Sequence, residues 1–173
     1  RHVAGSRTLV VVNRVATAVG LHDAMAKGAA KAGVTLALLH SRFRPPEREA
    51  AVARAVAKGF DGVVVATQVV EAGVDMTSRT LFTELAPWAS VVQRAGRCNR
   101  AGEEADATVW WVDHEAVDEG DEKARARAAL PYAHDDLTFA REHLLAMDSF
   151  NPEAIEARGV TLPFEPPTQV LRR

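Results

Sequence analysis

The sequence predicts an α/β domain with a parallel sheet whose two faces are covered by helices. Short runs rich in Val and Leu alternate with helix-like segments along the first 112 residues. These runs are continuously apolar, which is typical of strands buried on both faces of a parallel sheet. At 173 residues the chain is long enough for one such domain with a sizeable core. The strand–helix alternation further implies right-handed crossovers between neighbouring strands.

The predicted elements follow one another closely. Strands are expected over 8–12, 34–39, 62–66, 80–84 and 107–112. Helices are expected over about 15–32, 46–58 and 88–100. The second helix has the clearest start, because Pro45 and Pro46 stand where it begins. Glu47 and Glu49 follow them and favour the positive end of the helix dipole.

The chain changes character after residue 112. Residues 113–130 are first acidic and then basic and Ala-rich, which indicates a solvated loop leading into a helix that ends at Pro131. A further helix is expected over 135–147, and the terminal "LPFEPPTQVLRR" has three prolines and little periodicity. We therefore expect a sheet domain over 1–112. Residues 113–173 would form an acidic loop and a mainly helical or irregular extension, which packs on the sheet domain or leads to a neighbour.

The formal net charge of −2 conceals a strong asymmetry. Residues 1–102 hold 14 Lys and Arg and 7 Asp and Glu, whereas residues 103–173 hold 7 bases and 16 acids. A basic body with an acidic tail suggests an anionic partner for the body. A solvated charged face explains the same composition equally well.

Several classes of protein are not expected. No apolar run approaches the roughly 18 residues of a membrane span, and the opening "RHVAGSRTLVVV" has no signal-peptide pattern. With Cys98 as the single cysteine, neither an internal disulfide framework nor a cysteine-built zinc site is expected, and a reducing cytoplasm is the expected compartment. The missing initiator Met suggests an excised fragment.

The stretch "VVQRAGRCNR" crowds arginines onto one segment. In a helix over 88–100, Arg97 and Arg100 share one face, and Gln93 lies on the same side. Gly96 leaves room for the close approach of a phosphate or another surface. Arginine's planar fork of donors suits phosphate oxygens. From this geometry alone, phosphate binding and a solvated basic face both remain open.

A second polar stretch, "TQVVEAGVDM", directly follows the expected strand 62–66. Ligands of open α/β sheets gather at the carboxyl ends of strands. Thr67 offers a hydroxyl and an N–H to a phosphate, and Asp75 can accept from a ribose hydroxyl. The alternative is a connection held by local capping, in which Glu71 and Asp75 are an unfavourable like-charge pair four residues apart.

Aromatic residues near these stretches have structural interpretations as well as functional ones. His40 is expected to be structural rather than a DNA contact. Trp88 is expected to pack beneath the helix 88–100, with base stacking as the alternative. Trp110 and Trp111 are adjacent on a strand and must face opposite sides, so one is expected in the core and the other against the acidic tail.

Four stretches, taken in this order, resemble motifs IV, IVa, V and VI of superfamily 2 helicases. They are "TLVVVNRV", "LLHSRFRPPERE", "VVVATQVVEAGVDM" and "ELAPWASVVQRAGRCNR", and in that superfamily they lie in the second of two RecA-like domains. Over about residues 6–112 the chain is most similar to the helicase-nuclease of type I CRISPR systems, and the terminal "VLRR" resembles the chain just beyond that domain. The resemblance implies a RecA-like fold.

The resemblance also implies roles for individual residues. Arg100 and Arg97 would reach the γ-phosphate of ATP, and Gln93 would assist them at the nucleotide. Gly73 and Asp75 would lie at the nucleotide edge of the cleft between the two domains. The residues implied to meet DNA phosphates are Thr67, Asn13, Arg14, Ser41 and Arg42.

The chain departs from the helicase pattern in what it lacks. It contains no G-x-x-x-x-G-K-[ST], and no Asp-Glu pair after a strand that could organise Mg²⁺. The resemblance therefore implies that ATP and Mg²⁺ are held mainly by a first RecA-like domain, and that this domain and an HD nuclease domain belong to the parent chain. The isolated "HD" at 22–23 and "HDD" at 134–136 are not expected to bind metal. The chain alone is expected not to hydrolyse ATP.

The expected partners follow from the same resemblance. They are single-stranded DNA, the remaining domains of the parent chain and an RNA-guided CRISPR surveillance complex in the prokaryotic cytoplasm, without a membrane. Two alternatives stay open: the motor half of a repair or RNA helicase, and a non-catalytic RecA-like module that only binds nucleic acid. A motor requires a Walker-type domain upstream in the parent gene, whereas the module does not.

Overall fold

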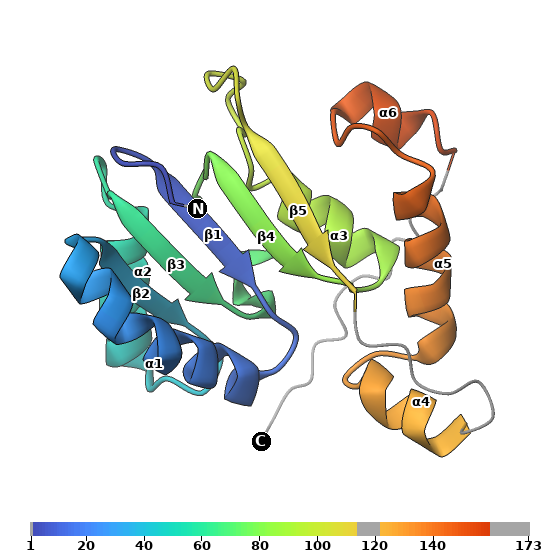
Figure 1. The fold of residues 1–173 in the computed structure, drawn as a ribbon, viewed down its shortest axis with the longest axis horizontal. Coiled ribbons are helices and arrows are strands. Elements are labelled where there is room, and N and C mark those ends of the chain that lie inside the picture. Colours follow the sequence, from blue (N-terminus) through green and yellow to red (C-terminus); the bar gives the residue numbers. More distant parts are fainter. Residues whose placement is uncertain (1, 114–121, 160–173) are drawn as a thin grey trace.

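The computed structural model describes residues 2–113 and 122–159 and contains a five-stranded parallel sheet (Figure 1). The strand order is β2-β3-β1-β4-β5. The strands are β1 (Arg7–Val11), β2 (Thr35–Leu39), β3 (Gly62–Ala66), β4 (Thr80–Glu84) and β5 (Thr108–Val112). Each coincides with a predicted strand, so the α/β fold class is confirmed. Most of the predicted acidic loop (114–121) and the terminal "VLRR" lie outside the described residues.

Helices α1 (Val15–Ala32) and α2 (Pro45–Val56) cover opposite faces of the sheet (Figure 1). Every residue of β3 is buried. Its Val63 and Val65 pack in one cluster with Ala18 of α1, whereas Val64 packs in the other with Ala55 of α2. A strand with apolar neighbours on both sides needs apolar residues at every position, which explains the continuous runs of the sequence.

Helix α3 (Trp88–Ala95) is shorter than the predicted helix 88–100. After Gly96 the backbone turns away to pair with the segment before β4. The N–H of Ser78 donates to the carbonyl of Arg97, and the N–H of Asn99 donates to the carbonyl of Ser78, both at 2.8 Å. The N–H groups of Arg97 and Cys98 still donate to carbonyls three residues back, but the helix does not continue beyond them. The prediction that Arg97 and Arg100 share one helix face was therefore wrong.

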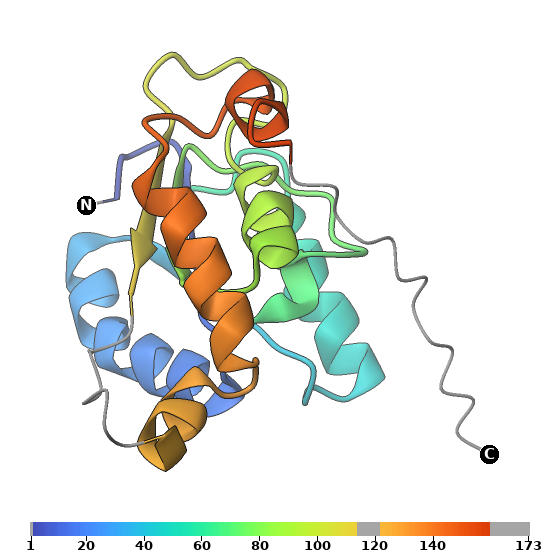
Figure 2. The same ribbon diagram turned by 90° about the vertical axis from the view of Figure 1, so that its right-hand side faces the viewer.

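Three further helices form the extension: α4 (Glu122–Ala129), α5 (His134–Leu145) and α6 (Pro152–Glu156) (Figure 2). Helix α5 runs beside α3, and the two pack through one apolar cluster. Trp88 is 4% exposed in that cluster, so its predicted packing role is confirmed. The predicted break at Pro131 also falls between α4 and α5. The extension thus packs on the sheet domain.

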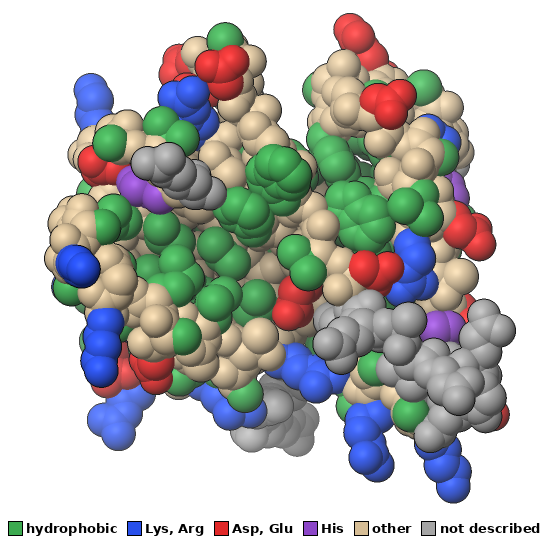
Figure 3. Space-filling view, in the orientation of Figure 1, with side chains coloured by type: hydrophobic (Ala, Val, Ile, Leu, Met, Phe, Trp, Pro, Cys, Tyr) green, Lys and Arg blue, Asp and Glu red, His purple; other side chains and the backbone are tan. Residues whose placement is uncertain are grey.

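The two adjacent tryptophans of β5 face opposite sides, as predicted. Trp111 joins the cluster of α3 and the extension. Trp110 is 56% exposed and stacks beside Phe82, with ring centroids 6.4 Å apart. Figure 3 shows hydrophobic side chains gathered on the face of the sheet that α1 covers only in part. The expectation of one core tryptophan and one against the tail is thus half correct, because Trp111 holds the extension while Trp110 lies open.

None of the helices in the described ranges is long and apolar enough to cross a membrane.

Candidate functional site

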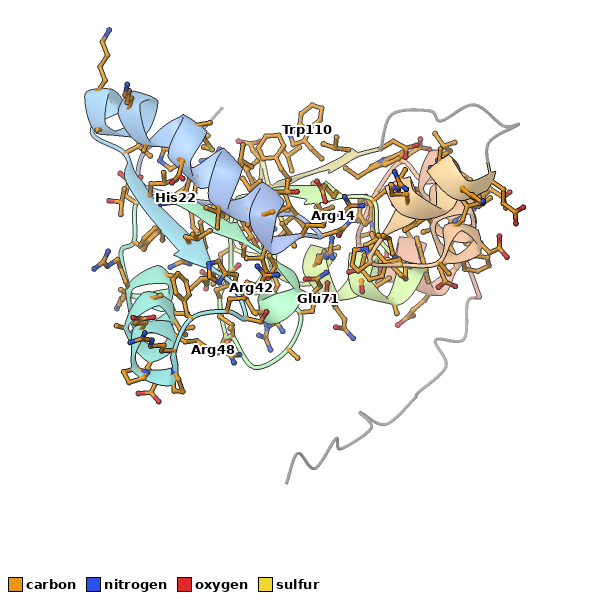
Figure 4. All side chains as sticks on the ribbon, turned by 90° about the horizontal axis from the view of Figure 1, so that it is seen from below. Arg14, His22, Arg42, Arg48, Glu71 and Trp110 are labelled. Atoms are coloured by element: carbon orange, nitrogen blue, oxygen red, sulfur yellow. The ribbon has the colours of Figure 1, made fainter. Side chains whose placement is uncertain are left out.

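The predicted site residues lie at two opposite edges of the sheet. Asn13, Ser41 and Thr67 follow the last residues of β1, β2 and β3, so they lie at the carboxyl edge, where these parallel strands end. Arg14 and Arg42 are next to them in the chain, and Figure 4 shows both side chains on this part of the molecule. The loops after the first three strands therefore begin side by side at this end of the sheet.

Arg97 and Arg100 lie instead toward the amino edge. Helix α3 starts after the end of β4 and leads the chain back along the sheet, so Arg97 pairs with Ser78, two residues before β4 begins. Arg100 donates its backbone N–H to the Thr77 Oγ1 at 3.0 Å. The structure therefore separates the residues with implied nucleotide roles from those with implied DNA roles.

The carboxyl edge is organised around Arg94, which is completely buried. Its Nε donates to Glu71 Oε1 at 2.8 Å, and its Nη2 donates to Asn13 Oδ1 at 3.0 Å. The remaining acceptors are the Thr83 hydroxyl, the Glu84 carbonyl and the Tyr132 hydroxyl. All five guanidinium donors thus have an acceptor. Sequence reasoning assigned Arg94 no role, although it stands in the same motif as Arg97 and Arg100.

Glu71 and Asp75 do not form the unfavourable like-charge pair that the alternative interpretation of this stretch implied. The short 3₁₀ helix η1 (Gln68–Val70) ends before Glu71, and no regular helix places the two carboxylates on one face. Glu71 faces Arg94, and it also accepts from the Ser90 hydroxyl at 3.1 Å. Asp75 faces Arg100. Each carboxylate therefore has its own cation.

Asn13 and Thr67 are buried, at 4% and 1% exposure. The Asn13 Nδ2 donates to the Leu85 carbonyl at 2.8 Å, and its backbone N–H donates to Glu84 Oε2 at 2.6 Å. With its Oδ1 occupied by Arg94, the Asn13 amide is committed to the interior of the protein. A direct contact between its side chain and a DNA phosphate stays a prediction, and would require this network to open.

Arg14 is exposed at the carboxyl edge but has protein partners. Its Nε donates to the Leu130 carbonyl at 2.9 Å, and its Nη2 donates to the Arg127 carbonyl at 2.8 Å and the Ala128 carbonyl at 3.4 Å. A cation at these last carbonyls favours the C-terminal end of α4. Arg14 thereby ties the start of α1 to the extension.

Arg42 and Ser41 are exposed polar residues of this edge. His40 is 8% exposed and stacks on Phe43 at 4.0 Å, and its Nδ1 accepts from the backbone N–H of Arg42 at 3.2 Å. His40 is thus structural, as predicted, and fixes the loop backbone. The exposed Arg42 side chain makes no hydrogen bond or ion pair with the rest of the described chain.

At the amino edge, Arg100 Nη1 donates to Asp75 Oδ1 at 2.6 Å. Both side chains are largely in solvent, at 52% and 90% exposure. The chain reaches Asp75 through a left-handed turn at Gly73, whose φ is 75°, a value that a residue with a side chain rarely adopts. A cavity of 510 Å³ opens beside this pair and is lined by Arg7, Val56, Asp75, Met76, Thr77, Arg100 and Ala101.

Arg97 is half-buried and holds the polar stretch after β3. Its Nε donates to the Val70 carbonyl and its Nη2 to the Glu71 carbonyl, each at 3.0 Å. Gln93 lies exposed on α3, one turn before Gly96. Arg97 is thereby bound to backbone carbonyls, whereas Arg100 is the exposed arginine of the motif.

The residues present fit one part of an ATP–Mg²⁺ complex. Arginine donors at the amino edge suit phosphate oxygens. A group of three His, Cys, Asp or Glu side chains that could hold a metal ion is not found among residues 2–113 and 122–159. His22 and Asp23 contact each other at 3.2 Å on the exposed side of α1. The described residues therefore present arginine donors at the amino edge but no cluster of three metal-ligating side chains.

The sheet order and the return of the arginine-rich segment to the amino edge define a RecA-like α/β domain. The family model described as the CRISPR-associated nuclease/helicase Cas3, C-terminal, matches residues 4–103. The chain belongs to this family, and the resemblance found in the four motifs is confirmed.

Individual relatives agree with this assignment. The CRISPR-associated helicase Cas3 of Thermoproteus tenax is 31% identical over 116 residues, which are 65% of this chain and 19% of the relative. The structure of T. fusca Cas3 with ADP has 29% identity and a TM-score of 0.55, over 64% of this chain and 15% of that one. A crystal structure of a CRISPR-associated protein matches 98% of this chain and 20% of that one, with a TM-score of 0.72; at 24% identity it shows the fold alone. The chain thus spans about a fifth of its relatives' length or less.

Proposed function

We propose that this chain is the second RecA-like half of an ATP-driven helicase that translocates on single-stranded DNA in type I CRISPR interference. The observation that carries this proposal is the division of exposed cations between two edges. Arg100 stands at a cavity on the amino edge. Arg42 stands on the carboxyl edge. A motor needs both a nucleotide-facing and a strand-facing surface on the same domain.

Arg100 is the arginine finger in this proposal. Its guanidinium is half exposed and makes one hydrogen bond, to Asp75, so most of its donors are available for phosphate oxygens. Asp75 holds the side chain over the cavity until a more highly charged phosphate competes for it. An arginine finger contributes roughly 10³–10⁵ in rate to phosphoryl transfer. Arg97 supports it by fixing the loop, and Gln93 and Gly73 are the further nucleotide contacts of this proposal.

In this proposal the first RecA-like domain of the parent chain holds ATP and Mg²⁺, which agrees with the lack of a three-ligand metal cluster among residues 2–113 and 122–159. Alone, the chain is inactive as an ATPase in this proposal. Its part is to bring positive charge to the γ-phosphate when the cleft between the two domains closes. The nucleotide named in the T. fusca Cas3 structure supports a nucleotide site in the parent protein.

The strand track lies at the carboxyl edge. Ser41 and Arg42 present a hydroxyl and an unpaired cation there, while Thr67 and Asn13 shape the loops beneath them. The segment 67–75 runs from the strand side to Asp75 at the nucleotide side. Since Arg97 and Arg94 fasten this segment to α3, closure of the cleft on ATP would move the strand track together with the finger as one body.

The parent protein supplies the remaining context of the proposal. Residues 1–112 form the motor domain, and residues 113–173 form an extension that contacts it through α3. An HD nuclease domain and an RNA-guided surveillance complex in the prokaryotic cytoplasm are the proposed partners. The family description, which names a CRISPR-associated nuclease/helicase, supports a nuclease and a CRISPR context for the parent protein.

Two substitutions in the parent enzyme test the division of labour between the edges. Arg100→Ala should abolish DNA-stimulated ATP hydrolysis while leaving the affinity for single-stranded DNA unchanged. Arg42→Ala should weaken that affinity while leaving the basal hydrolysis without DNA unchanged. If both substitutions impaired the same step to the same degree, the two edges would not have separate tasks. A parent that binds DNA but has no ATPase would identify a binding module.

A further inference from the structure

We propose that Arg7 is a positioning residue of the nucleotide site, and that it acts by fixing the segment 75–77 on which Arg100 depends. Arg7 lies just before the apolar run of β1, outside every stretch that the sequence analysis singled out. This inference rests on the proposed role of Arg100 as the arginine finger, and adds a residue that controls where that finger points.

Arg7 joins three segments at the amino edge of the sheet. It is the first residue of β1, and its Nη1 donates to the Thr77 carbonyl at 2.6 Å. Its Nη2 donates to the Ala57 carbonyl at 3.2 Å, just after α2. Its guanidinium also lies over the Phe60 ring, 5.3 Å from the centroid. One side chain thus fastens the segment before β4 to the segment between α2 and β3.

Thr77 is the link between Arg7 and Arg100. Its carbonyl accepts from Arg7, and its Oγ1 accepts from the backbone N–H of Arg100 at 3.0 Å. Asp75, two residues earlier, holds the Arg100 guanidinium, and Met76 between them is 3% exposed in the core. Both contacts that place Arg100 therefore come from residues 75–77, and the carbonyl of the last of these, Thr77, accepts from Arg7.

The environment of Arg7 is energetically unfavourable for a charged side chain whose only role is to stabilise the fold. Its Nε is the one buried side-chain polar atom without a hydrogen-bond partner in the described part of the chain. Burial lowers the pKa of its guanidinium from the ordinary value. Both of its hydrogen bonds go to carbonyls rather than to a carboxylate. A neutral side chain at this position would avoid these free-energy costs. The presence of a cation therefore indicates a function besides stabilising the fold.

The cavity beside Arg100 indicates what the function of Arg7 is. Arg7 and Arg100 line the same cavity, and Asp75 is its only acid in the described ranges. The charge-assisted hydrogen bond from Arg7 to the Thr77 carbonyl is stronger than a hydrogen bond between neutral groups. It therefore fixes the position of the Arg100 backbone relative to the cavity. Because a finger misplaced by about 1 Å loses much of its effect, the rigidity of this segment governs the rate of the chemical step rather than the binding of ATP.

The test is DNA-stimulated ATP hydrolysis by the full parent enzyme. We expect Arg7→Gln to lower kcat about tenfold, the worth of one hydrogen bond to a charged group, with little change in the KM for ATP. Arg7→Lys, which keeps a charged donor, should restore part of the loss. Thr77→Val, which removes only the Oγ1 acceptor, should also lower kcat. Lys58→Gln is the matched control, because exposed Lys58 lines the adjoining cavity without contacting Thr77, and its kcat should be normal.

Combination with Arg100→Ala decides whether Arg7 acts through Arg100. The double variant Arg7→Gln/Arg100→Ala should be no slower than Arg100→Ala alone, since nothing remains to be positioned. A normal kcat in Arg7→Gln and Thr77→Val, or losses that multiply in the double variant, would overturn the proposal. If Arg100→Ala itself kept normal turnover, the proposed function would fail first and the role of Arg7 with it. If kcat fell in Arg100→Ala but was normal in Arg7→Gln, only the proposed role of Arg7 would be rejected.

Discussion

The Nε of Arg94 donates to Oε1 of Glu71 at 2.8 Å, and the arginine side chain is completely buried. This pair joins α3 to the stretch after β3, and Asn13 and Tyr132 join the same guanidinium from β1's loop and from the extension. With the acceptors that β4 contributes, five parts of the chain thus meet at one cation. The network is the structural centre of the carboxyl edge.

Arg94→Leu should therefore destabilise the fold by about 3–5 kcal/mol, because it leaves Glu71 and several acceptors without their donor. Arg79→Leu provides the control, since its partners Glu104 and Asp106 are exposed and such a surface pair contributes under about 1 kcal/mol. Equilibrium unfolding in urea measures both. Similar small losses for the two variants would contradict the central role of Arg94.

Arg14 is predicted to hold the end of α4 as well as to face the strand. Arg14→Ala removes donors from three carbonyls, so hydrogen exchange in α4 should speed up, corresponding to about 1 kcal/mol of local stability. Arg42→Ala, an exposed neighbour on the same edge without those contacts, should leave α4 unchanged. Equal exchange in α4 of the wild type and Arg14→Ala would show that the carbonyl contacts contribute nothing.

The two tryptophans of β5 should respond differently to truncation. Trp111→Ala removes packing between the sheet domain and the extension, and should cost about 3 kcal/mol. Trp110→Ala should cost much less, because that side chain is 56% exposed. Urea unfolding of the two variants compares them directly. A larger loss for Trp110→Ala would mean that its face is covered in solution.

Cys98 is predicted to be an unreactive thiol near neutral pH. Burial raises the pKa of Cys98, whose Sγ donates to the Arg79 carbonyl at 3.5 Å. Because the folded chain holds this proton more tightly, the stabilisation is fully present below the unfolded pKa of about 8.5 and is lost as pH rises through the folded value. Iodoacetamide should therefore react more slowly with the folded chain than with the urea-unfolded chain. Equal rates at pH 8 would contradict this.

Strand binding by the carboxyl edge should depend on salt. Each phosphate contact contributes about −0.7 to the log–log slope of affinity against salt concentration for single strands. Arg42→Ala should reduce the magnitude of the slope by about one such contact, and Lys31→Ala, at the far end of α1, should not. Fluorescence anisotropy with a labelled oligonucleotide from 50 to 200 mM salt, a range of about half a log unit, measures it. An unchanged slope in Arg42→Ala would remove this residue from the track.

The positions of the strands could be predicted from the sequence alone, because each strand is a short run of consecutive apolar residues. The end of α3 could not be predicted in the same way. Gly96 and Asn99, whose φ is 48°, are residue types common at helix ends, but only the pairing with the distant Ser78 fixes the direction in which residues 97–99 continue. For the same reason, helical spacing could not reveal that Arg100 lies beside Asp75.

The division of the site also depends on long-range contacts. Motif order grouped Asn13 with exposed strand-binding residues, whereas the structure buries it against Arg94 and Leu85. No local pattern distinguishes Arg94, which is structural, from Arg100, which is exposed, since both are arginines of one motif. Nothing in the local sequence indicates a role for Arg7, because this role arises from contacts with Ala57 and Thr77, which lie 50 and 70 positions further along the chain.

The most direct test of the central claim is single-strand-stimulated ATP hydrolysis by the parent enzyme, comparing Arg100→Ala with the wild type. The account predicts a loss of several hundredfold or more in kcat, in line with the roughly 10³-fold or greater effect of an arginine finger, in a protein that remains folded and still binds DNA. Near-normal turnover of Arg100→Ala would contradict the account.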